Sequence, residues 1–169
     1  MNAANTLAVL GGHPVIRHPR GPAPAVGEEE AQAAAEVVRS GVLSDYVGAP
    51  GQAFMGGRRV RALEEQAAQY FGSRHALAVN SWTSGLICAV GALGLEPGDE
   101  VITTPWTMAA TATAIVHWNA IPVFADIDPA TFNIDPRCVE SLITPRTRAI
   151  LAVDIFGLPA DWAGLRAIA

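Results

Sequence analysis

The stretch "HALAVNSWTSGLICAVGAL" (residues 75–93) sets the pattern for most of the chain. Its first five residues form a short apolar run that predicts a strand at 75–79. The run from Thr83 to Leu93 is longer and apolar throughout, and it predicts a buried helix. Between them, "SWTSGL" (residues 81–86) gathers three hydroxyl groups and a glycine. A plain helix start needs one capping residue, so this junction has hydrogen-bond donors to spare.

The same alternation of strand and helix continues along the rest of the sequence. Strands are predicted at 100–104, 121–127 and 148–156, and helices at 108–118, 135–143 and 160–169. The runs "IPVFA" and "AILAV" are apolar on both faces, as buried parallel strands are. Alternation at this spacing indicates an α/β fold in three layers, α/β/α, with a mostly parallel sheet.

The part of the chain before this pattern is less regular. Residues 1–26 are rich in Gly, Pro and His without a period, and we expect an N-terminal arm there. Helices are predicted at 28–38 and 60–71, each followed by a glycine that suits a helix end. The irregular stretch between them, 43–57, is long, and loops of this length are usually functional or disordered.

Composition excludes several classes of protein. The chain has 169 residues, of which 50% are hydrophobic and 16% charged, against about 25% charged in a typical domain. The net charge is −5 with no basic run, so no nucleic-acid partner is expected. The longest apolar run, 85–95, is too short to cross a membrane, and the start lacks the features of a signal peptide. We expect a cytoplasmic protein with no membrane partner, whose apolar surface is partly covered by further sequence or a second subunit.

The sequence contains no lysine, because all eleven residues counted as Lys plus Arg are arginine. A mechanism that needs a lysine amine must therefore take it from outside these residues. The P-loop motif, which requires a lysine, is excluded, and the G-x-G-x-x-G dinucleotide motif is also missing. Cys88 and Cys138 are not in a C-x-x-C pair, and we expect both to be buried and reduced.

The hydroxyl-rich junction is the first candidate site. Ligands of open parallel sheets bind at the carboxyl ends of the strands. A helix N-terminus there offers unpaired N–H groups and the positive end of the helix dipole, which favour phosphate. Thr83 and Ser84 would add hydroxyl donors at the same place. The alternative is that Ser81 or Thr83 only caps the helix.

Five stretches match one known family in order. They are "SGVLSDYVG" (40–48), "RVRALEEQAAQYFGSRHALAVNSWTSGL" (59–86), "LEPGDEVITTPWTMAATATAI" (95–115), "AIPVFADIDPATFNIDP" (120–136) and "ITPRTRAILAVDIFGLPADW" (143–162). Together they resemble the amino-terminal part of the DegT/StrS family of pyridoxal-phosphate-dependent sugar aminotransferases. The resemblance implies that residues 27–169 are an incomplete large domain of PLP fold type I. The rest of that domain and a small carboxyl-terminal domain would lie outside this sequence.

The resemblance also implies roles for individual residues. Thr83 and Ser84 would contact the phosphate of pyridoxal 5'-phosphate, and Gly85 would allow close helix packing. The family usually has an aromatic residue at the position of Met108, stacked on the cofactor ring. A thioether can also lie against an aromatic face, and Trp106 could supply the ring instead. The alternative for Trp106 and Met108 is ordinary core packing.

Two further residues resemble substrate-side positions of the family. Asp154 stands at the end of a predicted strand, where the family often has a histidine near the substrate. Its alternative is a cap on the approach to the next helix. Tyr46 lies in a loop that the family places near the active site, with simple packing as the alternative. Asp126 and Asp128 are interpreted as turn residues beside Pro129 rather than metal ligands, and no metal site is expected.

The resemblance implies a reaction. Family members move an amino group from glutamate or glutamine to a keto-sugar, usually nucleotide-linked, or to a cyclitol ketone. A lysine downstream of the matched region carries the cofactor and exchanges protons. We therefore expect the parent enzyme to be a homodimeric aminotransferase and the 169-residue chain to be inactive alone. Two alternatives stay open: a sugar dehydratase of the same family, which has histidine in place of the lysine, and a non-catalytic module that binds a phosphorylated ligand.

Overall fold

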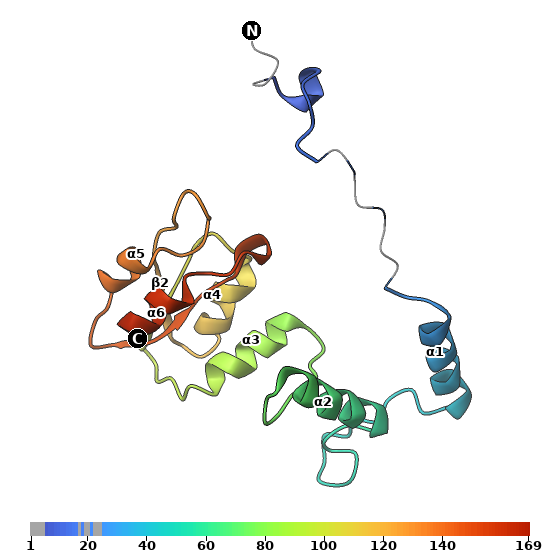
Figure 1. Cartoon of the computed structure of the whole chain (residues 1–169). Coiled ribbons are helices and arrows are strands. Elements are labelled where there is room, and N and C mark those ends of the chain that lie inside the picture. The colour runs from blue at the N-terminus through green and yellow to red at the C-terminus, as the bar shows by residue number, and fades with distance from the viewer. Residues whose placement is uncertain (1–5, 17, 19–20, 22–24) are drawn as a thin grey trace. The chain divides into compact units, whose positions relative to one another are not determined.

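The computed structural model describes residues 6–16, 18, 21 and 25–169, and the chain divides into two compact units, 1–75 and 76–169 (Figure 1). Parts of the expected arm, namely residues 1–5, 17, 19–20 and 22–24, lie outside the described residues. None of the helices in the described part is long and apolar enough to cross a bilayer.

The first unit contains a short 3₁₀ turn, η2 (Ala8–Leu10), and two helices, α1 (Glu28–Ser40) and α2 (Arg58–Phe71). The α1 helix begins with a capping hydrogen bond in which the Gly27 backbone N–H donates to the side-chain Oε2 of Glu30 over 2.7 Å. Both helices end at a glycine in the left-handed conformation, as predicted. Neither helix has a buried residue along its fully described length.

The second unit is built on a sheet of three parallel strands, β1 (Glu100–Thr103), β2 (Ile121–Phe124) and β3 (Thr147–Leu151), in the order β2–β1–β3. The helices of this unit alternate with the strands along the chain. They are α3 (Trp82–Gly91), α4 (Ala109–Val116), α5 (Pro136–Glu140) and α6 (Trp162–Ile168), with a 3₁₀ turn η3 (Ile155–Gly157) after β3. The predicted alternation is confirmed from residue 100 onward, but the strand predicted at 148–156 ends at Leu151, and its last two predicted residues belong to η3.

The two faces of the sheet are covered by different helices. Successive residues of a strand point to opposite faces, and β1 shows this with two fully buried neighbours, Val101 and Ile102. Val101 belongs to a cluster with Ile115 of α4. Ile102 belongs to a second cluster with Val139 of α5 and Leu165 of α6. The three-layer α/β/α architecture predicted from the sequence is therefore confirmed.

The prediction of a strand at 75–79 is wrong. In the described residues this segment is not part of the sheet, which contains only the three strands named above. A strand exists only through hydrogen bonds to a neighbouring strand, and the apolar pattern of 75–79 does not say where that neighbour is. Leu77 and Val79 are exposed.

Burial was also overestimated at two places. The β2 strand was predicted to be buried on both faces, yet Ile121 and Phe124 are exposed, because β2 is an edge strand with β1 as its one neighbour. The α3 helix was predicted to be buried, but Val90 is its only buried residue. The Trp118 side chain packs along one side of α3. Its Nε1 donates a hydrogen bond to the Ile87 carbonyl over 2.8 Å. Cys88, expected to be buried, is exposed.

Candidate functional site

The first turn of α3 is capped by one residue. Ser81 stands at the N-cap, where its Oγ accepts a hydrogen bond of 3.2 Å from the Ser84 N–H. Its carbonyl accepts from the Gly85 N–H over 3.1 Å. The capping function that the sequence left open between Ser81 and Thr83 is thus performed by Ser81.

The donors next to this cap are unused. Within residues 76–169, all of which the structure describes, the N–H groups of Trp82 and Thr83 have no hydrogen-bond acceptor, and neither does the Thr83 hydroxyl. The Ser84 Oγ accepts from the Ser81 hydroxyl over 3.2 Å, which leaves its own hydrogen free to donate. Unpaired donors at the positive end of a ten-residue helix suit an anion.

A cavity of about 590 Å³ lies beside these donors, at the carboxyl ends of β1 and β3. This volume is typical of a small-molecule site. Thr83, Met108 and Asp154, three of the predicted site residues, line it from the first turn of α3, the start of α4 and the loop after β3. The rest of its lining is mainly apolar and comprises Trp82, Leu86, Thr107, Ala110, Thr111, Leu151, Ala152, Val153 and Trp162. Ser84 is in the same helical turn as Thr83 but does not line the cavity.

Met108 and Trp106 take different positions. Met108 is the N-cap residue of α4, is 78% exposed, and lines the cavity of 590 Å³. The Trp106 ring is stacked on the Phe132 ring, with centroids 5.9 Å apart and planes inclined by 28°. Trp106 lines a second cavity of about 450 Å³, which also contains Met108. The two cavities therefore adjoin at Met108.

Asp154 braces the loop that follows β3. Its Oδ1 accepts two hydrogen bonds, one of 2.9 Å from the Ala160 N–H and one of 3.2 Å from Trp162 Nε1. These bonds match the capping alternative, since both donors lie at the approach to α6. The residue also lines the cavity. Asp154 thus supports the loop and also lines the cavity.

Asn133 holds the same loop from the other side, and the sequence analysis did not identify it. The residue is 4% exposed. Its Nδ2 donates to the carbonyls of Leu158 and Pro159, both over 3.1 Å, and its Oδ1 accepts from the Ile155 N–H over 3.0 Å. The only signal in the sequence was an amide between two apolar residues, Phe132 and Ile134, a weak pattern on its own.

The opposite end of β1 carries a paired carboxylate. Glu100 is 4% exposed and accepts from the Thr144 hydroxyl over 2.6 Å and from Arg146 Nε over 2.9 Å. The Thr144 hydrogen bond, followed by the bonds and charge of Arg146, holds the pKa of Glu100 below its ordinary value despite burial. Buried side-chain oxygen and nitrogen atoms all have partners within the described residues.

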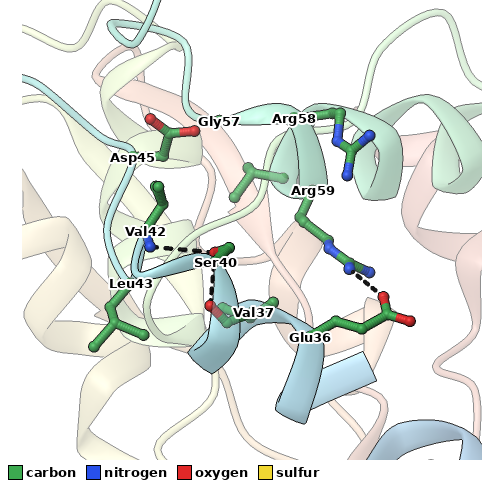
Figure 2. Close-up of a pocket in the computed structure, with 10 residues that line it drawn as sticks. Glu36, Val37, Ser40, Val42, Leu43, Asp45, Gly57, Arg58 and Arg59 are labelled. Carbon is green, nitrogen blue, oxygen red and sulfur yellow. Dashed lines mark hydrogen bonds and ion pairs between the residues drawn. The ribbon is translucent and has the colours of Figure 1, made fainter. Parts of the chain in front are cut away.

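The first unit contains its own hollow, of about 460 Å³, between the end of α1 and the start of α2 (Figure 2). Arg59 pairs there with Glu36 over 2.9 Å, and both side chains are more than half exposed. Tyr46 does not line it. The Tyr46 ring packs instead on Gly56, where a Cβ would come within 2.9 Å of it, so the residue has the packing contact named as its alternative.

Asp126 and Asp128 are turn residues, as interpreted from the sequence. Asp128 Oδ1 accepts from the Ala130 N–H over 2.7 Å and from the Thr131 N–H over 3.2 Å, which is an Asx turn. Asp126 Oδ1 accepts from the adjacent Ile127 N–H over 2.8 Å. No cluster of three or more His, Cys, Asp or Glu side chains suited to a metal ion occurs among the described residues.

The model of the DegT/DnrJ/EryC1/StrS aminotransferase family matches residues 24–169. The chain belongs to this family. It is 43% identical over 146 residues to the spore coat polysaccharide biosynthesis protein SpsC of Bacillus subtilis, covering 86% of this chain and 35% of that protein. It is 44% identical over 163 residues to a putative L-glutamine:3-amino-2,3-dideoxy-scyllo-inosose aminotransferase of Streptoalloteichus tenebrarius, covering 96% of this chain and 38% of that protein.

Solved structures of the family share the fold. An aminotransferase from Psychrobacter cryohalolentis superimposes with a TM-score of 0.76 at 34% identity, over 89% of this chain and 36% of that one. The PLP form of the putative sugar aminotransferase Spr1654 from Streptococcus pneumoniae gives a TM-score of 0.73 at 29% identity, over 86% and 34% of the two chains. The chain thus has the large-domain fold of PLP fold type I enzymes and spans little more than a third of the length of these relatives.

Proposed function

We propose that this chain is the phosphate-binding part of a pyridoxal-phosphate-dependent aminotransferase that acts on a sugar or cyclitol ketone. The observation that carries the proposal is the set of unused donors at the start of α3, on Trp82 and Thr83, beside a cavity of 590 Å³. Membership of the aminotransferase family and the PLP form of a structural relative support the same cofactor.

The residues present fit this cofactor. Its phosphate needs several donors, and Thr83, Ser84 and the first N–H groups of α3 have them available. A charge-assisted hydrogen bond contributes about 1.5–3 kcal/mol, so a few together suffice for tight retention. Its ring needs an apolar surface, and the cavity offers the Met108 thioether among mainly apolar neighbours. Neither requirement forces a described residue to give up an existing partner.

The overall reaction exchanges an amino group for a carbonyl oxygen. Glutamate or glutamine gives up its amino group and becomes an oxo acid, while the acceptor ketone becomes a primary amine, so no external oxidant or reductant is consumed. Bound pyridoxal phosphate supplies the electron sink and carries the amino group between the two substrates. In this proposal Thr83 and Ser84 hold the phosphate, Met108 lies against the ring, and Asp154 faces the substrate side of the cavity.

The lysine that this chemistry requires is not among the 169 residues. We place it in further sequence of the parent protein, because the relatives are nearly three times as long as the matched region. The chain by itself would then bind the cofactor without turning over substrate. A homodimer is part of the proposal, since the many large exposed apolar side chains of this chain need a cover.

The test uses the full-length protein that contains this chain, loaded with pyridoxal phosphate. L-glutamate and L-glutamine are tried as donors, with scyllo-inosose and a UDP-linked 3-oxo-hexose as acceptors. Mass spectrometry of the acceptor should show a ketone converted into a primary amine. Loss of water from the sugar would favour the dehydratase, and an unchanged acceptor with a bound phosphorylated ligand would favour the binding module.

A further inference from the structure

Phe156 has a backbone conformation that its side chain disfavours. Its φ and ψ angles are 53° and 20°, in the left-handed region that bulky residues rarely adopt. Among the described residues only Asn119 and Phe132 share a positive φ without being glycine. Asparagine tolerates this region well, so the strain is concentrated at the two phenylalanines.

Packing inside the unit explains the left-handed conformation of Phe132 but not that of Phe156. Phe132 is 43% exposed and stacks on Trp106. Phe156 is 85% exposed, and its ring has no aromatic partner among the described residues. Packing within the described residues therefore does not offset the strain at Phe156, and backbone strain of this kind clusters at functional sites.

The surrounding loop is built to keep this conformation. Asn133 binds three backbone groups of the segment 155–159, on both sides of Phe156. Asp154 binds the Ala160 N–H and the Trp162 indole at the end of the same loop. Five hydrogen bonds therefore hold a loop whose central side chain makes little contact of its own. Strain persists where the surroundings over-determine it.

The ring lies beside the candidate cofactor site. Phe156 lines the cavity of 450 Å³ together with Trp106, Met108 and Ile155. That cavity shares Thr107 and Met108 with the cavity of 590 Å³. A ligand that fills both cavities would therefore contact Met108 and Phe156.

We propose that Phe156 is a specificity-determining residue whose ring contacts the six-membered ring of the acceptor ketone. This inference rests on the proposed function. The C–H face of a sugar or cyclitol is apolar and flat enough to lie on an aromatic ring, whereas glutamate and glutamine have no such face. The contact thus acts on the acceptor and not on the amino donor, and it selects ring ketones over short oxo acids.

The test compares four variants of the full-length protein loaded with pyridoxal phosphate. Phe156→Gly and Phe156→Asn relieve the strain and remove the ring, Phe156→Tyr keeps the ring, and Asn119→Gly changes a left-handed residue at the other end of the sheet. Thermal unfolding, the donor half-reaction and the acceptor half-reaction are measured for each, the last with the ring ketone that the wild type accepts and with pyruvate.

The proposal predicts that Phe156→Gly and Phe156→Asn raise Tm by a few degrees while raising KM for the ring ketone about tenfold or more. The donor half-reaction and pyruvate should stay within twofold, and Phe156→Tyr and Asn119→Gly should keep the wild-type KM. Unchanged KM for the ring ketone in both strain-relieving variants would overturn the proposal, as would a fall in Tm, which would make the ring structural. A wild type that aminates no ketone would instead refute the proposed function, so the two failures are distinguishable.

Discussion

The two ends of strand β1 differ in how their polar groups are used. At the amino end, Glu100 is buried and both of its carboxylate oxygens accept hydrogen bonds, from Thr144 and Arg146. Beyond the carboxyl end, the donors of Thr83 have no protein partner and face a cavity. A satisfied polar group stabilises a fold, whereas an unsatisfied one in a hollow is available to a ligand. The contrast assigns stability to one end of the sheet and binding to the other.

The binding end is not simply looser. Asn133 and Asp154 hold the loop after β3 with bonds as regular as those of Glu100. The two ends of β1 differ in which polar groups still lack a hydrogen-bond partner among the described residues. At this end the hydrogen-bonded loop lies beside free donors and an exposed ring, and a preorganised loop of this kind would reduce the entropic cost of binding a ligand.

The largest effect is expected from Asn133→Ala. Three backbone groups of the loop would lose their partner, and the free energy of unfolding should fall by about 2–3 kcal/mol. Urea unfolding of the full-length protein measures this. In Asn133→Asp the carboxylate still accepts from the Ile155 N–H but faces two carbonyl oxygens. The loss of unfolding free energy in Asn133→Asp, relative to the wild type, should therefore grow as pH rises. Wild-type stability in both variants would mean that the loop is held by other contacts.

Glu100→Gln should lower stability less and in a pH-dependent way. Since the pKa of Glu100 is lower folded than unfolded, the pair stabilises the protein above the ordinary carboxyl value of about 4.5. That contribution is lost as pH falls through the lowered pKa. The difference between wild type and variant should thus be largest near pH 7 and vanish in acid, while cofactor affinity stays the same. A constant difference from pH 7 to 3 would contradict the assigned pKa shift.

Met108→Phe should have the smallest effect. An aromatic side chain at this position gains a stacking contact with the cofactor ring worth about 0.5–1.5 kcal/mol, or roughly a two- to twelvefold gain in affinity. Visible absorbance during dialysis against buffer reports retention of the cofactor. Met108→Ala serves as the counterpart and should weaken retention. Equal retention in Phe, Met and Ala forms would remove Met108 from the site.

The fold was predictable where local pattern and neighbour agree. The segment from Glu100 to Leu151 alternates strand and helix, and each strand finds its partner in the same sheet. The prediction failed at 75–79, because an apolar run cannot show whether a neighbouring strand exists. It also failed for the burial of β2, since the sequence does not say which strand stands at an edge.

The sequence brought three of the proposed site residues to one cavity but did not reveal the residues that support it. The rule that ligands bind at the carboxyl ends of parallel strands applies to Met108 and Asp154, which follow β1 and β3. Thr83 lines the same cavity although no strand among the described residues precedes α3. The loop held by Asn133 and the left-handed conformation of Phe156 depend on contacts between residues more than twenty positions apart. No local pattern encodes such contacts.

The central claim is that the first turn of α3 binds the cofactor through its phosphate. The most direct measurement is the affinity of the full-length protein for pyridoxal phosphate and for pyridoxal, in the wild type and in Thr83→Val/Ser84→Ala. The wild type should strongly prefer the phosphorylated form, and the variant should lose about 100-fold in affinity for it, with little change for pyridoxal. If the variant keeps the wild-type preference within threefold, the phosphate is bound elsewhere and the account is wrong.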